Sequence, residues 1–530
     1  MDGRHPDTAK AFAKTYRGFS RLKARKWDRT IWRGVRKLLK KKDSYQPETC
    51  EQEITIEELN PVITEARLSK AADNDEICYE LIKNLGPKAQ QIILKIFNKI
   101  WTNGIELPRN WRLAIIITLL KEGKDPKLTS SYRPISLTAC LGKLLEKIIA
   151  DRLTYLLESK GLITNNQAGF RQGRCTTDQV LKLTQSATDQ MHHRKGGNST
   201  IVTFFDYEKA YDKVWRDGLL HKLQALNIPW RFTRYVRNFL SGRQTMVEVN
   251  GVRSKKFLLK EGLPQGSAIS PLLFLVFIND IDADLSMETL ASLFADDTSI
   301  WKQGGKLEEL AKLGMQPEVD KIIAWATEWK MSINTDKTKS MTISSNTKDT
   351  NSHLELKANN NPIGNVKKYK FLGITIDSDL RFKDHVTTLA KKCRKRNNIL
   401  KSMVWKNWGN SLEMQRTLYI QYIRSCLDYA SSSWSPWIAD THMKKLESVQ
   451  NEALRAMAGL AKTCPTDFLR LETNIEPIQQ RYEKNDDIVW DRYMRLPETD
   501  DRRQMLNKYI PLRLKTRAGW RNKTGDRIKQ

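Results

Sequence analysis

The spacing of hydrophobic positions changes from helical to strand-like near residue 112. Between residues 54 and 111, apolar residues recur at three- and four-residue intervals, as in EELNPVITEARLSK and AQQIILKIFNKIW, which predicts two or more amphipathic helices. Residues 113–120, LAIIITLL, form instead a continuous apolar, β-branched run of strand length. The next segment, KEGKDPKLTSSYRPISL, is basic and punctuated by Gly and Pro, which predicts a loop.

Further predicted strands lead into acidic residues. STIVTFF (199–205) runs directly into Asp206, and the segment after it, EKAYDKVWRDGLLHKLQAL, returns to helical periodicity. TLASLF and TSIW flank Asp296 and Asp297, a pattern that predicts a hairpin with carboxylates at its tip. MTISS and KYKFLGITID add strands, and beyond Asp377 the pattern is helical to the end.

Length and charge narrow the class of protein. A chain of 530 residues exceeds what one hydrophobic core usually supports, so we expect at least two domains or a series of subdomains. Apolar residues make up 40% and aromatic residues 8%, which excludes wholesale disorder. The 90 Lys and Arg residues exceed the 61 Asp and Glu residues by 29, which favours a polyanionic partner, either nucleic acid or an anionic membrane.

Other features argue against a membrane role. No apolar run approaches the roughly 18 residues of a spanning helix, and the start, MDGRHPDTAK, resembles neither a signal peptide nor a lipidation motif. The seven cysteines are scattered, which favours an intracellular, reducing compartment, in the nucleus or cytoplasm. Residues 1–43 are strongly basic and contain Trp27 and Trp32, which predicts a nucleic-acid-binding arm or, alternatively, a solvated linker or a remnant of a longer protein.

The strand-end carboxylates predict a metal site. Hard oxygen ligands on rigid elements suit Mg²⁺, and two such ions about 4 Å apart would activate an attacking hydroxyl and stabilise a leaving pyrophosphate. Asp-Asp pairs also occur at 486–487 and 500–501, where polar helical surroundings suggest solvated surface. Only Asp296 and Asp297 lie between two apolar strands with a strand-terminal Asp206 upstream.

Several segments, in order, resemble a known family. The core motifs of reverse transcriptases are matched by FFDYEKAYDKVW, EGLPQGSAISPLLF and FADD. The segments YRPISLT, NQAGFR, SINTDKTKSM and KFLGITID resemble the enzymes of non-LTR retrotransposons, particularly jockey-like elements. The resemblance covers roughly residues 50 to 520. Any single motif is weak evidence, whereas the whole set of motifs in this order is specific to the family. It implies an α+β right-hand polymerase with fingers, an antiparallel-sheet palm and a helical thumb.

The resemblance also implies catalytic residues. Asp206, Asp296 and Asp297, with the carbonyl of Tyr207, would hold two Mg²⁺ ions, for which Mn²⁺ could substitute. Lys337 matches a lysine that would protonate the departing pyrophosphate. The alternative is that the three aspartates are ordinary surface acids. This explains them poorly, because crowding carboxylates at strand ends destabilises the folded state unless cations neutralise them.

Nucleotide-binding residues follow from the same resemblance. Tyr211 matches a bulky residue that would exclude the ribose 2′-hydroxyl, or it is simply a core aromatic. Gln265 and Gly266 would approach the incoming deoxynucleoside triphosphate and the template, although an ordinary turn is the alternative. Lys121 and Arg133 correspond to residues that hold the triphosphate, or they are solvated loop residues.

Primer and template contacts are implied further along the chain. The resemblance assigns Phe371, Leu372 and Gly373 to a turn that holds the primer end. In the helical segment 389–401, four basic residues recur at i, i+4 spacing, which predicts a thumb helix along the duplex backbone or a solvated face. These residues are Lys391, Lys392, Lys395 and Arg396. The implied partners are template RNA, a DNA primer, the RNA/DNA hybrid and deoxynucleoside triphosphates.

One segment departs from the family pattern. Jockey-like sequences carry a Gly-Pro-Asp turn where KAADNDEI has Asp73 and Asn74 before Asp75, which puts this turn in doubt. Upstream endonuclease and downstream ribonuclease H regions have no room, so we expect a fragment or truncated copy. The expected divisions are a basic arm (1–48), a helical extension of the fingers (49–110), fingers and palm (111–377), thumb and C-terminal region (378–511), and a basic connector or tail (512–530).

Two hypotheses of different class therefore remain open. An active RNA-directed DNA polymerase is favoured by the complete set of matched catalytic residues. A catalytically inactive remnant that binds RNA is favoured by the expected truncation and the altered turn. An RNA-directed RNA polymerase or an intron-encoded maturase would share the palm, but Tyr211 argues against the former and YRPISLT with the C-terminal pattern against the latter.

Overall fold

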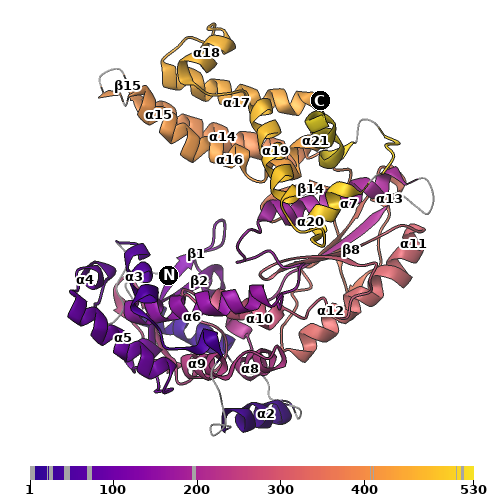
Figure 1. Ribbon diagram of the computed structural model, residues 1–530. Helices are drawn as coiled ribbons and strands as arrows, with labels where there is room; N and C mark the ends of the chain where they lie inside the picture. Colours follow the sequence, from indigo (N-terminus) through magenta and orange to yellow (C-terminus); the bar gives the residue numbers. More distant parts are fainter. Residues whose placement is uncertain are drawn as a thin grey trace. The chain divides into compact units, whose positions relative to one another are not determined.

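The protein divides into two compact units, each assembled from separate stretches of the chain (Figure 1). The first comprises Met1–Phe170, Tyr207–Asp284 and Ile322–Ile333, and the second Arg171–Asp206, Leu285–Lys321 and Asn334–Gln530. The computed structural model describes residues 6–20, 22, 25, 28–40, 48–68, 75–193, 199–405, 408–409, 411–508, 510–514 and 518–529. Asp73 and Asn74 of the altered turn, and Trp27, therefore lie outside the described residues.

The first unit is built on a mixed sheet in the order β2-β1-β4-β5, with β6 also paired to β4. The apolar run predicted as a strand forms β1, which pairs antiparallel with β2 and parallel with β4. Its first four residues are buried and its last two are exposed, so β1 leaves the core where the basic loop begins. The strands are β1 (Leu113–Leu120), β2 (Tyr132–Leu137), β4 (Gln244–Val249), β5 (Val252–Arg253) and β6 (Phe257–Leu258).

Helices surround this sheet. The helical spacing predicted between residues 54 and 111 is borne out by α3, α4 and α5. The helices of the unit are α1 (Pro6–Phe19), α2 (Asp28–Lys40), α3 (Ile56–Glu65), α4 (Tyr79–Lys83), α5 (Pro87–Trp101), α6 (Cys140–Ser159), α8 (Arg216–Ala225), α9 (Trp230–Leu240) and α10 (Ser270–Ile278). The α10 helix is buried along its whole length because SPLLFLVFI offers no polar face.

The N-terminal basic segment contributes a packed helix. Phe12 and Tyr16 of α1 are buried against Ile116 of β1 and Val247 of β4. The ring of Phe12 meets that of Tyr132 edge-on, with centroids 4.9 Å apart. The described part of the expected arm is thus helical, and α1 belongs to the core of the first unit because one of its faces is apolar.

The second unit is centred on a sheet in the order β12-β9-β3-β8-β7. Every residue of the central strand β3 is buried, as its β-branched and aromatic sequence TIVTFF requires of a strand covered on both faces. All pairings in this sheet are antiparallel except that of β12 with β9. The strands are β3 (Thr200–Phe205), β7 (Leu290–Phe294), β8 (Asp297–Gln303), β9 (Lys339–Ile343) and β12 (Gly364–Asn365).

Helix α7 (Thr176–His192) packs against this sheet. Val180 and Leu183 of α7 share a buried core with Phe204 of β3. The indole of Trp301 in β8 donates a hydrogen bond to Ser186 Oγ at 3.0 Å. The helix therefore forms a rigid backing for the strands that end in acidic residues.

The C-terminal half of the second unit is mainly helical, as predicted (Figure 1). Helix α14 packs along α17. The remaining helices are α11 (Leu307–Glu309), α13 (Thr347–Asn351), α14 (Lys383–Ser402), α15 (Leu412–Leu418), α16 (Ser425–Asp428), α17 (Asp440–Ala458), α18 (Thr466–Thr473), α19 (Ile478–Met494), α20 (Asp501–Asn507) and α21 (Gly519–Lys529). Helix α12 (Gln316–Glu328) has its first residues in the second unit and the rest in the first. Short hairpins are formed by β10 (Lys357–Ala358) with β11 (Asn361–Pro362), β13 (Lys368–Phe371) with β14 (Ile374–Asp377), and β15 (Val404–Trp405) with β16 (Trp408–Gly409).

The end of the chain folds back onto α7. Arg521 of α21 forms a bidentate ion pair with Asp189, with both nitrogen–oxygen distances 2.9 Å, and both side chains are only 6% exposed. The residues expected to form a connector or tail thus include a helix that is anchored in the second unit.

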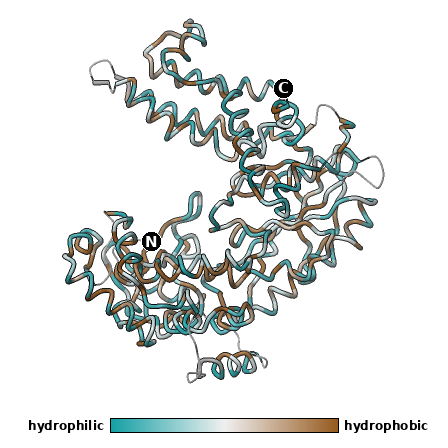
Figure 2. Tube along the Cα trace, in the orientation of Figure 1, coloured by the Kyte–Doolittle hydropathy of each residue, from teal (hydrophilic) through white to brown (hydrophobic). Residues whose placement is uncertain are grey.

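Figure 2 shows hydrophobic and hydrophilic residues alternating along most helices, as expected of amphipathic elements on globular cores. In the part of the chain that the structure describes, no helix combines the length and the apolar character needed to cross a bilayer.

Candidate functional site

Three carboxylates gather at one edge of the sheet of the second unit. Asp206 directly follows β3, and Asp297 is the first residue of β8. Because Phe205 pairs with Thr298, residues 206 and 297 lie side by side at the end of neighbouring strands. Asp296 lies in the two-residue connection from β7 to β8. We call Asp206, Asp296 and Asp297 the acidic sheet edge.

A tight hairpin creates this arrangement. Phe294 pairs with Asp297, so only Ala295 and Asp296 connect the strands, and Ala295 takes a positive φ of 55°. Positive φ is what two-residue hairpin connections require, and a residue with a Cβ pays a cost in strain there. The hairpin predicted from TLASLF and TSIW is therefore present, with its carboxylates at the tip.

The carboxylates repel one another. Partial burial, followed by the charges of Asp296 and Asp206, raises the pKa of Asp297 to about 6. Like charges this close disfavour simultaneous ionisation, so a cation at the edge would lower the free energy of the folded state.

Lys337 supplies one such cation. Its Nζ lies 3.3 Å from Oδ2 of Asp206, and its side chain is 63% exposed. The backbone holds the lysine loop against Asp206: the carbonyl of Asp206 accepts a hydrogen bond from Asn334 N at 2.8 Å, and its N–H donates to Thr338 Oγ1 at 3.3 Å. The structure thus brings together Lys337 and Asp206, which are far apart in the sequence.

Tyr369 is a neighbour of the acidic sheet edge that the sequence analysis missed. Its ring stacks on Phe204, with centroids 4.1 Å apart and an interplanar angle of 12°. Burial, followed by the charges of Asp297 and Asp206, raises the pKa of its hydroxyl to about 12. Strand alternation could have revealed it, since Tyr369 shares a face of β13 with Phe371, which also contacts Phe204.

The predicted primer-binding turn joins β13 to β14. Leu372 and Gly373 both take positive φ, of 46° and 88°, whereas Phe371 is buried in the core. The hydroxyl of Tyr429 donates a hydrogen bond to the Leu372 carbonyl at 3.0 Å. A Cβ on Gly373 would lie 3.1 Å from the Tyr429 ring, so Tyr429, a second residue that the motifs did not reveal, holds this turn.

The predicted nucleotide-binding residues all belong to the first unit. Tyr211 is half-buried and stacks on Phe274 of α10, with centroids 4.6 Å apart. Lys121 and Arg133 lie on the β1–β2 hairpin, where Leu119 pairs with Arg133. Lys121 Nζ donates a hydrogen bond to the Ser130 carbonyl at 3.2 Å, and the Arg133 side chain is exposed.

A network of contacts fixes Gln265 and Gly266. Gln265 Nε2 donates a hydrogen bond to Oδ1 of Asp212 at 3.0 Å, and the Gln265 carbonyl accepts one from Ser136 N at 2.6 Å. Gly266 takes φ of +118°, and a Cβ there would lie 2.5 Å from the Ser136 carbonyl. Burial raises the pKa of Asp212 to about 6, against the opposing effects of Gln265 and Lys121. Asp212 was not singled out by sequence reasoning, although it lies next to Tyr211.

The predicted basic face of the thumb is only partly available. Lys391, Lys392 and Lys395 of α14 are exposed. Arg396 instead lies over the Tyr422 ring, 4.3 Å from its centroid, and donates a hydrogen bond to the Tyr422 carbonyl. The guanidinium of Arg396 therefore links α14 to Tyr422 and contributes to the packing of the second unit.

The solvated surface expected around Asp486 is not observed. The Asp486 side chain is 5% exposed, and burial raises its pKa to about 7, with Ser432 as the principal opposing hydrogen-bond donor. The expectation was wrong because α19 packs against residues 431–433, a contact that the local polarity of the sequence does not reveal.

Among the described residues, no three His, Cys, Asp or Glu side chains are arranged closely enough to hold a metal ion. The donors at the acidic sheet edge are nevertheless carboxylate oxygens, which hard divalent cations prefer. Burial, followed by the neighbouring charges of Asp296 and Asp206, raises the pKa of Asp297, so the ionised carboxylate is disfavoured at this edge. The chemistry of these donors therefore fits a divalent cation.

Comparison with known proteins gives a consistent result. Residues 120–376 match the family "Reverse transcriptase (RNA-dependent DNA polymerase)". A probable RNA-directed DNA polymerase from transposon BS of Drosophila melanogaster is 27% identical over 479 residues, which cover 89% of this chain and 52% of that protein. The RNA-directed DNA polymerase from mobile element jockey of the same species is 30% identical over 412 residues, 77% of this chain and 44% of that protein. The chain thus spans about half the length of the curated relatives it matches.

Among solved structures, telomerase from Candida Tropicalis with a fragment of telomeric RNA is 12% identical, with a TM-score of 0.38, covering 78% of this chain and 67% of that one. The sequence relatives confirm the resemblance to jockey-like enzymes. The family match, together with the mixed helices and sheets, confirms the predicted fold class, an α+β right-hand polymerase.

Proposed function

We propose, from the premise that this chain belongs to the reverse transcriptases of non-LTR retrotransposons, that it copies RNA into DNA by nucleotidyl transfer. The observation that carries the proposal is the acidic sheet edge, where burial, followed by the charges of Asp296 and Asp206, raises the pKa of Asp297 to about 6. Such crowding is costly for stability, and it is typical of sites that bind cations for catalysis.

In this proposal the acidic sheet edge binds two divalent cations, Mg²⁺ or Mn²⁺ in its place. Asp206, Asp296 and Asp297 supply carboxylate oxygens, and Tyr207 a backbone carbonyl. When bound, the cations activate the primer hydroxyl and stabilise the leaving pyrophosphate. The buried strand β3 and the tight β7–β8 connection keep the three carboxylates in position.

Lys337 acts as the proton donor. Its Nζ, 3.3 Å from Asp206, gives a proton to the departing pyrophosphate oxygen. The hydrogen bonds between the Asp206 backbone and residues 334 and 338 support this role because they limit the positions that the lysine can reach.

The incoming deoxynucleoside triphosphate is recognised by groups of the first unit. Lys121 and Arg133 bind its phosphates, and Tyr211 excludes a ribose 2′-hydroxyl. Gln265 and Gly266 contact the nucleotide and the template base. The hydrogen bond from Gln265 to Asp212 supports this assignment, since a glutamine amide fixed in orientation discriminates better than a free one.

The remaining assignments concern nucleic acid. Leu372 and Gly373, with Phe371 in the core behind them, position the primer end for in-line attack. Lys391, Lys392 and Lys395 contact the phosphates of the hybrid between template RNA and DNA primer, which fixes position without reading sequence. Residues 111–377 then correspond to fingers and palm, 49–110 to a helical extension of the fingers, and 378–511 to the thumb and C-terminal region.

Primer extension tests the proposal. The full chain, given a primed RNA template, Mg²⁺ and deoxynucleotides, should extend the primer, and Asp296→Asn should stop extension. Asp284→Asn removes the charge of an exposed carboxylate outside the acidic sheet edge and should leave extension unchanged. Extension that survives Asp296→Asn, or that Asp284→Asn abolishes equally, would refute the assignment.

The alternative, an inactive remnant that binds RNA, is not favoured. It predicts salt-sensitive RNA binding with no extension by the unmodified chain. The same assay distinguishes the two, because only the polymerase shows extension that depends on Asp296.

A further inference from the structure

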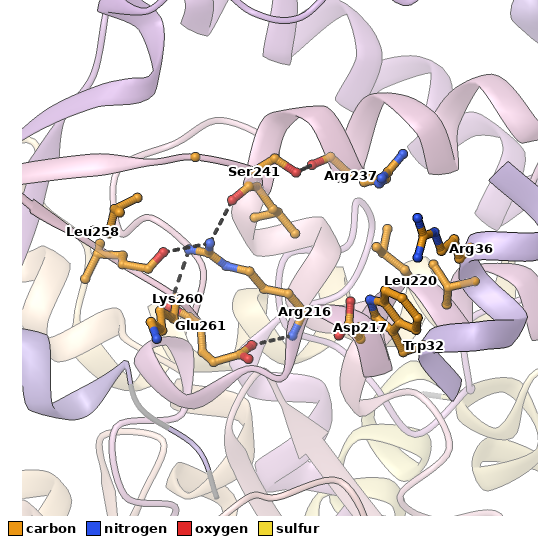
Figure 3. A pocket seen from close by; sticks show the side chains of 14 residues that line it. Trp32, Arg36, Arg216, Asp217, Leu220, Arg237, Ser241, Leu258, Lys260 and Glu261 are labelled. Carbon is orange, nitrogen blue, oxygen red and sulfur yellow. Dashed lines mark hydrogen bonds between the residues drawn. The ribbon is translucent and has the colours of Figure 1, made fainter. Parts of the chain in front are cut away.

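A cavity of about 580 Å³ opens between α2, α8 and α9 in the first unit (Figure 3). Ile31 and Val35 of α2 are buried, each 4% exposed. Asp28 pairs with Lys330 at 2.5 Å, which fixes the start of α2. The cavity is therefore bounded by anchored elements, and its volume lies within the roughly 300–1,000 Å³ of typical ligand sites.

On one wall of the cavity, the polar groups of Arg216 already form hydrogen bonds within the protein. The guanidinium of Arg216 donates hydrogen bonds to the carbonyls of Leu240, Leu259 and Gly262, at 2.7, 2.9 and 3.0 Å. Its backbone N–H donates to the Glu261 carboxylate at 2.9 Å. Figure 3 shows the hydrogen bond between the Arg216 backbone and the Glu261 carboxylate. Arg216 thus belongs to the fixed wall and has few donors left for a ligand.

The other basic residues of the cavity are differently placed. Arg36, Arg237 and Lys260 are exposed, and none of them forms a salt bridge within the described part of the chain. Two acids also line the cavity, but burial raises the pKa of Glu261 to about 7 and also raises that of Asp217. The balance of charge is positive, which suits an anionic ligand.

An aromatic platform lies beside these cations. The Trp32 indole is 46% exposed, which is unusual for so large an apolar surface. The Arg36 guanidinium lies over it, 4.8 Å from the ring centroid. A guanidinium held by its face keeps its in-plane N–H groups directed outward, where they bind phosphate. Figure 3 shows Trp32 and Arg36 on the side of the cavity opposite Lys260 and Glu261.

We propose that this cavity binds single-stranded nucleic acid, with one base against Trp32 and phosphates on Arg36, Arg237 and Lys260. The combination of an exposed aromatic side chain with cations that form no salt bridge among the described residues is typical of proteins that bind single strands irrespective of sequence. None of these residues has a role in nucleotidyl transfer above, so the inference goes beyond the proposed function. The site would hold a strand that is outside the RNA/DNA hybrid.

Binding is measured on the full chain carrying Asp296→Asn, saturated with a primed RNA template, so that a second strand reports on other sites. A short labelled oligouridine should bind, and Trp32→Ala should weaken binding about 5- to 150-fold, the effect of one stacked base. Arg36→Ala with Arg237→Ala should reduce the slope of log K against log salt by about 1.4, two single-strand phosphate contacts.

Lys37→Ala is the matched control. Lys37 is an exposed cation on the same helix but does not line the cavity, so this change should affect binding and slope less than loss of Arg36 with Arg237. Trp32→Phe keeps an aromatic face and should restore most of the affinity, which separates stacking from misfolding. The proposal is overturned if Lys37→Ala weakens binding as much as Arg36→Ala with Arg237→Ala does. It is also overturned if Trp32→Ala leaves binding unchanged.

Crosslinking locates the strand directly. A thiouridine-substituted oligonucleotide should crosslink to peptides spanning residues 28–40 or 258–261, and crosslinks that map only elsewhere overturn the proposal. Oligothymidine should compete, because the contacts involve base faces and phosphates and no 2′-hydroxyl. Primer extension by the otherwise unmodified chain should survive Trp32→Ala on a short primed template, so failure of polymerisation and failure of this site are distinguishable.

Discussion

Replacing Asp297 by Asn should stabilise the protein while it abolishes primer extension. Asp297 lies among like charges, and its pKa is raised from 3.8 to about 6. An acid with a raised pKa in the folded state destabilises that state whenever it is ionised. At pH 7 Asp297 is ionised in both states, and burial together with the neighbouring charges destabilises the ionised carboxylate only in the folded state.

The size of the effect follows from the shift. The difference between 3.8 and about 6 corresponds to roughly 3 kcal/mol as an upper bound. Asp297 is only partly buried, and screening by solvent reduces this to about 1 kcal/mol. For a unit of this size that is a rise in melting temperature of about 1 to 2 °C.

Thermal melting at several pH values measures this effect. The stability gained by Asp297→Asn should be greatest at pH 7 and above, shrink as pH falls through 6, and vanish below about 4, where the carboxyl is protonated in both states. Mg²⁺ should raise the melting temperature of the unmodified chain more than that of the variant, since the cation relieves the same repulsion.

The control is Asp284→Asn, which removes an exposed charge elsewhere and should give no pH-dependent gain. Either of two results would refute the electrostatic reasoning. The first is a variant that is less stable than the parent at pH 7. The second is a gain of the same size at pH 4 as at pH 7.

Further predictions concern other parts of the protein. Tyr211→Ala should admit ribonucleotides, measured as the ratio of kcat/KM for ribonucleotide and deoxynucleotide incorporation. Arg521→Met should destabilise the second unit by about 3 to 5 kcal/mol, because it leaves Asp189 buried and unpaired, and denaturant unfolding measures this. Tyr429→Phe removes the hydrogen bond to the Leu372 carbonyl and should raise the KM for primer several-fold, which corresponds to about 1 kcal/mol, with kcat little changed.

Each of these predictions has a contrary outcome. An unchanged sugar preference in Tyr211→Ala would identify the tyrosine as a core aromatic only. Unfolding of Arg521→Met at the parental denaturant concentration would show that the ion pair adds nothing, and Lys529→Met, an exposed cation of the same helix, is the control. If Tyr429→Phe instead lowered kcat with an unaltered KM, the turn would not be positioning the primer.

Local pattern was enough to locate the strands that carry the chemistry. The runs LAIIITLL, TIVTFF and TLASLF are mostly apolar, and each contributes an expected strand. TIVTFF is buried along its whole length, as a strand covered on both faces requires, whereas LAIIITLL becomes exposed at its end. Asp206 and Asp296 could be singled out because a charged residue at the end of an apolar strand contrasts with its neighbours.

What the sequence could not show depends on contacts between distant segments. Tyr369 reaches the acidic sheet edge only because its hairpin packs on Phe204, and Tyr429 approaches Leu372 from 57 residues away. Asp486 lies in a polar stretch but becomes buried where its helix meets another element. Arg396 belongs to a basic run of the sequence, yet in the folded protein its guanidinium packs on the Tyr422 ring.

The docking of α21 onto α7 has a consequence for the order in which the second unit can fold. The strands that carry the acidic sheet edge precede α21 in the chain, so the helix that backs them keeps the Asp189 carboxylate without its ion-pair partner until Arg521 has been synthesised. A chain cut before α21 would keep Asp206, Asp296 and Asp297. Its second unit would still be less stable, because the buried Asp189 carboxylate would have lost its cation.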